Sequence, residues 1–176
     1  GDPVAGPPAV KLENDFGQGF QGVDIVAHIN QNSYSAASTD TVTTDASGVA
    51  TFNNLVLEKA AGNYQIIFEV DYSGVPNTST QYFDVTAGTA STMEMVTQPG
   101  NGLAEAAISG PPAVVLYDDY GNPISNADVT VSEAGGYTLD AGTLTRSTGS
   151  DGRATFDDLV INTPGGRESK EDDSYI

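Results

Sequence analysis

The sequence contains no cysteine and no tryptophan in its 176 residues. Without cysteine the chain can form neither a disulfide bond nor a metal site with thiolate ligands. Its stability must therefore come from packing and hydrogen bonding. Hydrophobic residues make up 38% of the chain, and the apolar set favours Val, Ile, Phe and Tyr, which suit β-strands. This composition indicates a lean globular β protein.

Basic residues are also scarce. Six lysines and arginines stand against 24 aspartates and glutamates, so the formal net charge at pH 7 is −18. A surface with this charge repels nucleic-acid phosphates and anionic lipids. We therefore predict no nucleic-acid partner and no direct membrane contact. Three interpretations of the acidity stay open: solubility, the binding of divalent cations, and the attraction of a cationic partner.

The sequence lacks any apolar run close to the roughly 18 residues of a membrane span. It also has no secretory signal at its start. A mature or excised fragment would share this property, so its absence does not argue for the cytoplasm.

What the sequence does contain is a repeat. Residues 110–161 match residues 6–57 with a constant offset of 104 positions, most clearly at 48–57 and 152–161. Between residues 6–62 and 110–166, 20 of 57 aligned positions are identical without a gap. We therefore predict two copies of one fold unit.

Short segments with alternating apolar residues recur about every 8–12 residues, with turn-forming residues between them. Residues 23–29 place Val23, Ile25 and Ala27 on one face, and residues 64–72 alternate in the same way. Residues 31–38 are polar and are expected to cross a sheet edge. No window has helical spacing. The pattern is typical of an all-β sandwich.

The repeat fails at both ends of the chain. After Gly166 an alternating strand like residues 64–68 is expected, but residues 167–173 are charged. The second copy therefore lacks its last two strands. Nothing before Gly6 matches the strand predicted at 92–97, so the first copy lacks its first strand. We expect the chain to be a piece of a longer array, cut out of phase with its domains.

Several motifs carry a family resemblance. In the second copy they are Asp-Asp-Tyr-Gly-Asn-Pro at 118–123, Asp-Val-Thr-Val-Ser at 128–132, Gly-Thr-Leu-Thr at 142–145 and Ser-Asp-Gly-Arg-Ala-Thr-Phe at 150–156. Residues 49–52 and 64–68 of the first copy fit as well. These segments resemble the bacterial immunoglobulin-like repeats of invasin-type and other large surface adhesins. The resemblance implies Greek-key sandwiches strung as stalk modules outside a bacterial cell, and it brings no catalytic residues.

Together these features predict an all-β chain of two tandem immunoglobulin-like Greek-key β-sandwiches, the second lacking its last strands. The predicted domains are residues 1–88, without a first strand, and residues 89–176. The second domain lacks its last two strands and ends in the charged tail 167–176.

Acidic turn residues suggest a calcium site. In an immunoglobulin-like sandwich the loop with Asp118, Asp119 and Asn122 is expected at the same end as the turn with Asp151. Ca²⁺ prefers carboxylate and carbonyl oxygens, so these four residues are the candidate ligands. The alternative is turn chemistry, in which Asp and Asn side chains bond their own backbone.

We predict no enzyme and no catalytic residue. His28 is the one histidine, and it is expected to point outward between Ala27 and Ile29. Ser132 takes its place in the second copy. A catalytic base needs a positioned partner, and no Ser–His pair recurs between the copies.

The predicted function is structural: stalk modules of an extracellular bacterial adhesin or surface fibre that serve cell-surface display and adhesion. The predicted partners are neighbouring repeats of the same array and a surface glycan or protein ligand. Three alternatives stay open. They are a calcium-assisted carbohydrate- or protein-binding module, a strand-swapped filament subunit, and an accessory domain of a secreted enzyme. No cofactor other than calcium is expected.

Overall fold

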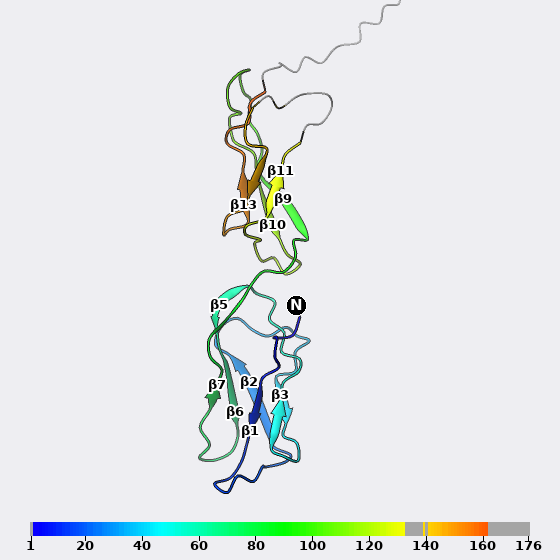
Figure 1. Ribbon diagram of the computed structural model, residues 1–176, viewed down its shortest axis with the longest axis vertical. Coiled ribbons are helices and arrows are strands. Elements are labelled where there is room, and N and C mark those ends of the chain that lie inside the picture. Colours follow the sequence, from blue (N-terminus) through cyan, green and yellow to red (C-terminus); the bar gives the residue numbers. More distant parts are fainter. Residues whose placement is uncertain (1, 133–138, 140, 162–176) are drawn as a thin grey trace, which may run out of the picture. The chain divides into compact units, whose positions relative to one another are not determined.

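The computed structural model describes residues 2–132, 139 and 141–161 (Figure 1). These residues form strands and no helix, which confirms the predicted all-β class. None of them belongs to a helix long and apolar enough to cross a membrane. The strands are β1 (Ala9–Lys11), β2 (Asp24–Ile29), β3 (Thr41–Thr43), β4 (Val49–Thr51), β5 (Ala61–Tyr64), β6 (Ile66–Val70), β7 (Thr78–Ser79), β8 (Phe83–Val85), β9 (Thr92–Thr97), β10 (Ala113–Tyr117), β11 (Asp128–Thr130), β12 (Thr145–Ser147) and β13 (Arg153–Thr155).

The chain divides into two compact units. The first comprises Gly1–Gly88 and Tyr120–Asn122, and the second comprises Thr89–Asp119 and Pro123–Ile176.

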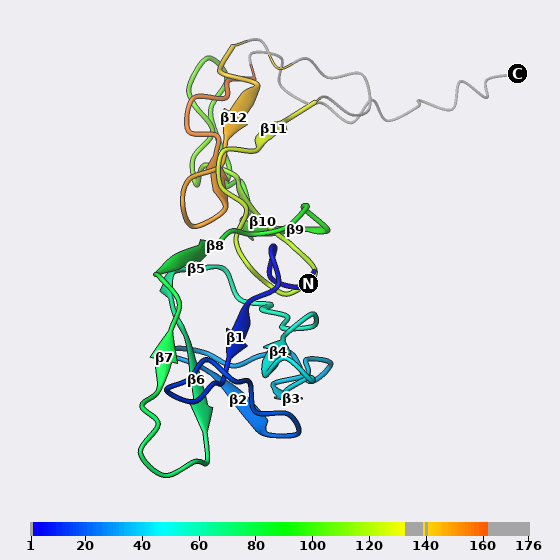
Figure 2. The same ribbon diagram turned by 60° about the horizontal axis from the view of Figure 1, so that its bottom comes forward.

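The first unit is a sandwich of two layers. One layer is the sheet β3-β2-β6-β7, whose strands run side by side in Figures 1 and 2. In the other layer β1 pairs with β4. Strands β5 and β8 form a further pair. In the sequence β5 comes directly before β6, and β8 follows β7. The chain changes layer after β1, after β3 and after β4, which is the Greek-key connection of immunoglobulin-like sandwiches.

The core of the first unit takes side chains from both layers. Ile25 and Ala27 of β2 and Phe68 of β6 meet Ala50 of β4 and Phe52, which follows it. The ring centroids of Phe52 and Phe68 lie 5.1 Å apart. Alternation along β2 and β6 supplies this buried face, as the sequence pattern predicted. Full burial of each large apolar side chain stabilises the fold by about 1.5–3 kcal/mol.

The same glycine turn precedes β4 in the first unit and β13 in the second. Gly48 and Gly152 have φ angles of 80° and 74°, which favour glycine. A Cβ atom at Gly48 would overlap the Leu12 carbonyl oxygen, and one at Gly152 would lie 2.7 Å from the Leu116 oxygen. Each glycine carbonyl in turn accepts the N–H of the same leucine at 2.9 Å. The turn therefore lies directly on the neighbouring strand, where only glycine fits.

A buried threonine also recurs. The hydroxyl of Thr44 donates to the Phe20 carbonyl oxygen at 2.6 Å and accepts the Val23 N–H at 3.0 Å. The hydroxyl of Thr148 makes the equivalent bonds to Ile124 and Ala127 at the same distances. Both threonines are buried, and these bonds satisfy their hydroxyl groups.

The second unit contains a three-stranded sheet, β13-β10-β9, and the pair β11-β12. Its buried cluster is Val114, Ala154, Phe156 and Leu159, with Val129 and Val131 of the facing layer packed against it. Strand registers recur at an offset of 104 positions. Ala9↔Thr51, Val10↔Ala50 and Asp24↔Thr43 in the first unit match Ala113↔Thr155, Val114↔Ala154 and Asp128↔Ser147 in the second.

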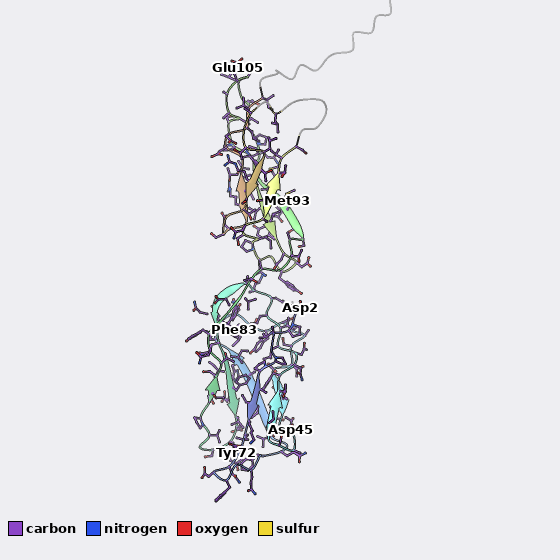
Figure 3. All side chains as sticks on the ribbon, in the orientation of Figure 1. Asp2, Asp45, Tyr72, Phe83, Met93 and Glu105 are labelled. Carbon is purple, nitrogen blue, oxygen red and sulfur yellow. The ribbon has the colours of Figure 1, made fainter. Side chains whose placement is uncertain are left out.

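Strand β9 is the most exposed apolar strand. Met93 and Met95 are 61% and 51% exposed, and Figure 3 labels Met93 on this strand. Within the described residues, β11 pairs only with β12, whereas β2 pairs with both β3 and β6.

Phe52 and Phe156 are equivalent core residues of the two copies, and truncating each in turn tests whether the units unfold separately. Phe52 is 1% exposed, so Phe52→Ala is expected to destabilise the first unit by about 3–5 kcal/mol. Hydrogen exchange should then accelerate in β2 while β10 keeps its protection. Phe156→Ala should give the reverse pattern.

The control for this experiment is Phe16→Ala in the same unit. Phe16 is 89% exposed, so its truncation should change stability by no more than about 0.5 kcal/mol. Loss of protection in both units after either core substitution would contradict separate cooperative units.

Candidate functional site

The structure describes all four candidate calcium ligands. Among the described residues, no group of three Asp, Glu, His or Cys side chains is placed to hold a metal ion, so Asp118, Asp119 and Asp151 form no such group. Asp118 is buried and Asp119 is exposed, while Asn122 is buried and groups with the first unit.

Backbone hydrogen bonds occupy two of these side chains instead. Within the first unit the amide of Asn122 donates to the Glu58 carbonyl oxygen at 2.7 Å and accepts the Ala60 N–H at 2.9 Å. A carboxylate oxygen of Asp151 accepts the N–H of Arg153, two residues on, at 3.1 Å. The Asp151 bond is the local turn chemistry that the alternative interpretation describes, whereas Asn122 bonds backbone groups far away in the sequence.

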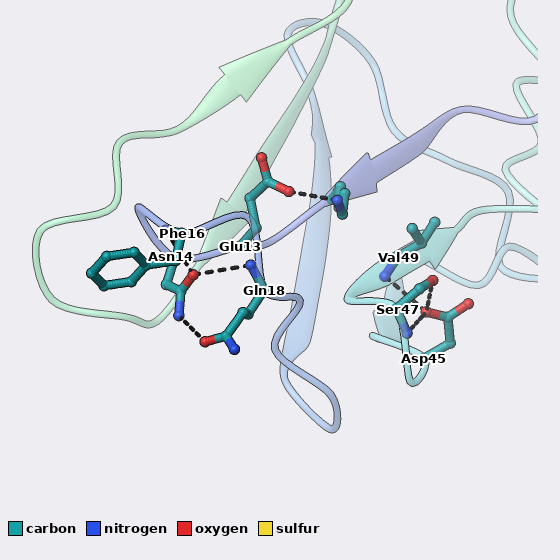
Figure 4. Close-up of polar contacts among 8 residues, drawn as sticks. Glu13, Asn14, Phe16, Gln18, Asp45, Ser47 and Val49 are labelled. Atoms are coloured by element: carbon teal, nitrogen blue, oxygen red, sulfur yellow. Dashed lines mark hydrogen bonds and ion pairs between the residues drawn. The ribbon is translucent and has the colours of Figure 1, made fainter.

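The equivalent turns of the first unit show the same chemistry (Figure 4). The Asn14 side-chain oxygen accepts the N–H groups of Phe16 and Gln18, each at 3.0 Å. A carboxylate oxygen of Asp45 accepts the Ser47 hydroxyl at 2.7 Å and the Val49 N–H at 3.0 Å. The Ser47 hydroxyl, followed by these backbone donors, lowers the pKa of Asp45. In these turns the polar side chains accept hydrogen bonds from their own turn.

We expect calcium to leave the thermal stability of the chain unchanged, because its turn carboxylates already accept protein hydrogen bonds. The measurement is a thermal melt in millimolar calcium and again in excess chelator. A rise in the melting temperature with calcium, reversed by chelator, would restore the calcium hypothesis.

Asp158 is a carboxylate of the second unit whose pKa is strongly lowered. It accepts the Thr143 N–H at 3.0 Å and the Thr143 hydroxyl at 2.7 Å, and Arg146 lies 3.0 Å away. These donors lower its pKa to about 2, the Thr143 N–H contributing most. The carboxylate thus ties the segment before β12 to the segment after β13.

This contact predicts a pH-dependent loss of stability. The folded-state pKa lies below the ordinary value of 3.8, so the stabilisation is fully present above pH 4 and is lost as pH falls through about 2. Asp158→Asn should therefore destabilise the second unit at pH 7, and the difference from the parent chain should shrink between pH 4 and pH 2. The stability difference is measured by urea unfolding at each pH, monitored by hydrogen exchange in β12.

Asp157→Asn is the matched control, because it removes the same charge beside Arg146. In the described contacts Asp158, and not Asp157, accepts the Thr143 donors. A pH-independent difference for Asp158→Asn, or an equal effect of Asp157→Asn, would contradict the assigned role.

His28 lies on the outer face of β2, as predicted. Its Nε2 atom is 3.1 Å from a carboxylate oxygen of Glu69 on the paired strand β6, and both side chains are more than half exposed. A contact at this exposure is a surface pair that contributes little to stability.

A cavity of 460 Å³ lies in the first unit between the end of β2 and the loop of residues 30–40. The volume falls within the range of small-molecule sites. Polar side chains dominate the loop side of its lining, namely Asn32, Ser33, Tyr34, Ser35, Ser38 and Asp40. This cavity is a candidate binding site in the described part of the chain.

Three consecutive amides fix the first half of this loop. Asn30 donates to the Asn63 carbonyl oxygen at 2.9 Å and accepts the Gln65 N–H at 2.8 Å. Gln31 donates to the Gly62 carbonyl oxygen at 2.6 Å. Asn32, whose φ is 56°, donates to the Tyr64 hydroxyl at 2.7 Å. The loop is thereby attached to the segment that forms β5.

The second half of the loop is attached to residues 54–56. The Ser38 hydroxyl accepts the Val56 N–H at 2.9 Å, and the Ser35 N–H donates to the Val56 carbonyl oxygen at 2.8 Å. The Asn54 amide donates to the Ala37 carbonyl oxygen at 2.6 Å. Both ends of the loop are therefore held by hydrogen bonds to the rest of the unit.

Tyr34 is the aromatic residue of the cavity. Its side chain is about half buried, and its hydroxyl lies 3.4 Å from the His28 carbonyl oxygen. Burial raises the pKa of Tyr34 to about 12, and the nearby negative charge of Asp40 adds to the shift. The hydroxyl donates its single proton to the His28 carbonyl oxygen, so the Tyr34 oxygen can still accept a hydrogen bond from a ligand.

The sequence pattern placed residues 31–38 at a sheet edge and missed this site. Two signals were available. The segment Asn-Gln-Asn-Ser-Tyr-Ser at 30–35 has the Tyr, Ser and Asn composition of recognition loops. In addition, the polar residues of this segment are not repeated 104 positions later in the sequence, whereas the residues of the flanking strands are.

Comparison with known proteins gives one structural similarity. No family model and no curated protein matches the chain. A solved structure, the D0-D1 domain of Intimin, is similar over 89% of this chain and 76% of that chain. The sequence identity is 20% and the TM-score is 0.37, so the similarity carries no conclusion about activity or ligand.

Proposed function

We propose that the chain is a structural segment of a bacterial cell-surface adhesin or surface fibre. In this proposal it consists of two copies of one immunoglobulin-like module, displayed outside the cell. Its function is to hold other parts of the adhesin or fibre at a distance from the cell and to display them. The modules are not enzymes, and neighbouring modules of the same array are their partners.

One observation carries the proposal. The two units share their strand registers, their glycine turn and their buried threonine at a constant offset of 104 positions. Repetition of a small sandwich with its own core is how stalk proteins gain length. The adhesin-type sequence motifs support the same interpretation.

The acidic surface fits this role. A net charge of −18 makes neighbouring copies repel one another and keeps the chain soluble. Self-repulsion would hold adjacent fibres apart on a crowded cell surface. Salt would weaken that repulsion, because exposed charges are screened within about 8 Å at physiological ionic strength.

Surface location is the testable core of the proposal. An antibody raised against the purified chain is expected to label intact cells that produce the protein, and external protease should remove the labelling. A cytoplasmic protein labelled in parallel is the control for cell integrity. Labelling that appears only after the cells are permeabilised would refute the proposal.

A further inference from the structure

The cavity beside Tyr34 has the features of a built binding site. Its loop is fixed at both ends by the hydrogen bonds of Asn30, Asn32 and Ser38, so a ligand does not have to order it. Preorganisation of this kind lowers the entropy cost of binding. A structural linker needs no such network, because it only has to connect β2 with β3.

The lining offers hydrogen-bond donors and acceptors together with an aromatic ring. The Ser33 hydroxyl donates and accepts, the Tyr34 hydroxyl oxygen accepts because its proton is directed at the His28 carbonyl oxygen, and the Asp40 carboxylate accepts. Ile29 and the ring of Tyr34 supply apolar surface beside them. A ligand that matches this lining carries several hydroxyl groups and also has an apolar face.

The charges of the lining exclude other ligand classes. No lysine or arginine lines the cavity, the imidazole of His28 in the lining already faces the Glu69 carboxylate, and Asp40 would repel a phosphate, sulfate or carboxylate. A metal ion needs several oxygen ligands, but the lining contains one carboxylate. A cationic ligand would find that single carboxylate and would leave the hydroxyl groups unused.

The residues that line the cavity are not repeated in the sequence of the second copy, although the flanking framework is. At the aligned positions of the second copy, Asn32, Tyr34, Ser38 and Asp40 are replaced by Gly136, Thr138, Gly142 and Leu144.

We propose that this cavity binds a neutral carbohydrate of one or two sugar units. The Tyr34 ring stacks on the apolar face of the sugar, and its hydroxyl oxygen accepts a hydrogen bond from a sugar hydroxyl group. Asp40 and Ser33 bond the sugar hydroxyl groups. The first unit is then a recognition module as well as a structural one.

The experiment uses the full chain, labelled with ¹⁵N, and a panel of neutral disaccharides: lactose, maltose, cellobiose and N,N′-diacetylchitobiose. At least one sugar is expected to shift the amide resonances of residues 28–40 saturably while those of the second unit stay in place. Tyr34→Ala should weaken that binding by about tenfold or more, a loss of roughly 1.4 kcal/mol. Tyr82→Ala, at a tyrosine of the same unit that is 64% exposed, should not weaken it.

Two further variants separate recognition from folding. Tyr34→Phe keeps the ring and should bind more weakly than the parent chain but better than Tyr34→Ala. Asp40→Asn keeps the shape of the side chain and should weaken binding without changing hydrogen exchange in β2. The proposal fails if no sugar shifts residues 28–40, or if Tyr34→Ala binds as well as Tyr82→Ala. It also fails if a cationic probe such as choline saturates the site and the sugars do not.

Discussion

Both units depend on a backbone approach that only glycine allows. At Gly48 and Gly152 the turn lies against the carbonyl oxygen of the neighbouring strand, and a side chain there would push the two apart. This contact fixes the register in which Ala50 faces Val10, so Phe52 points into the core. A slip of one residue would turn the same side chains to solvent. The buried hydroxyl of Thr44 secures the facing layer in the same region.

A fixed framework leaves its loops free to differ. Glycine turn, threonine and core phenylalanine are the same in both copies, whereas residues 30–40 of the first copy have chemistry of their own. Side chains outside the framework hold that loop, chiefly Asn30 and Ser38. Loop identity therefore changes without any cost to the sandwich, which is how one fold carries different binding functions.

Local patterns predicted the fold, because strand alternation and turn residues act over a few neighbours. Ile25 and Phe68 are buried as their alternation indicated. The cavity could not be predicted in the same way, since it depends on bonds such as Asn32 to Tyr64 between residues far apart in the chain. The calcium hypothesis treated Asp151 as a free ligand. In the structure its carboxylate accepts a backbone N–H of its own turn, and sequence alone does not distinguish the two uses.

The exposed face of β9 has a chemical consequence. The chain has two methionines and no cysteine, so Met93 and Met95 hold all of its sulfur. Both side chains are more than half exposed on one strand, where a peroxide reaches them without unfolding the protein. Oxidation to the sulfoxide would turn this apolar strip polar while the core, which contains no sulfur, stays untouched. Exposure to an oxidant would thus modify a single strand, and methionine sulfoxide reductases can reverse this modification.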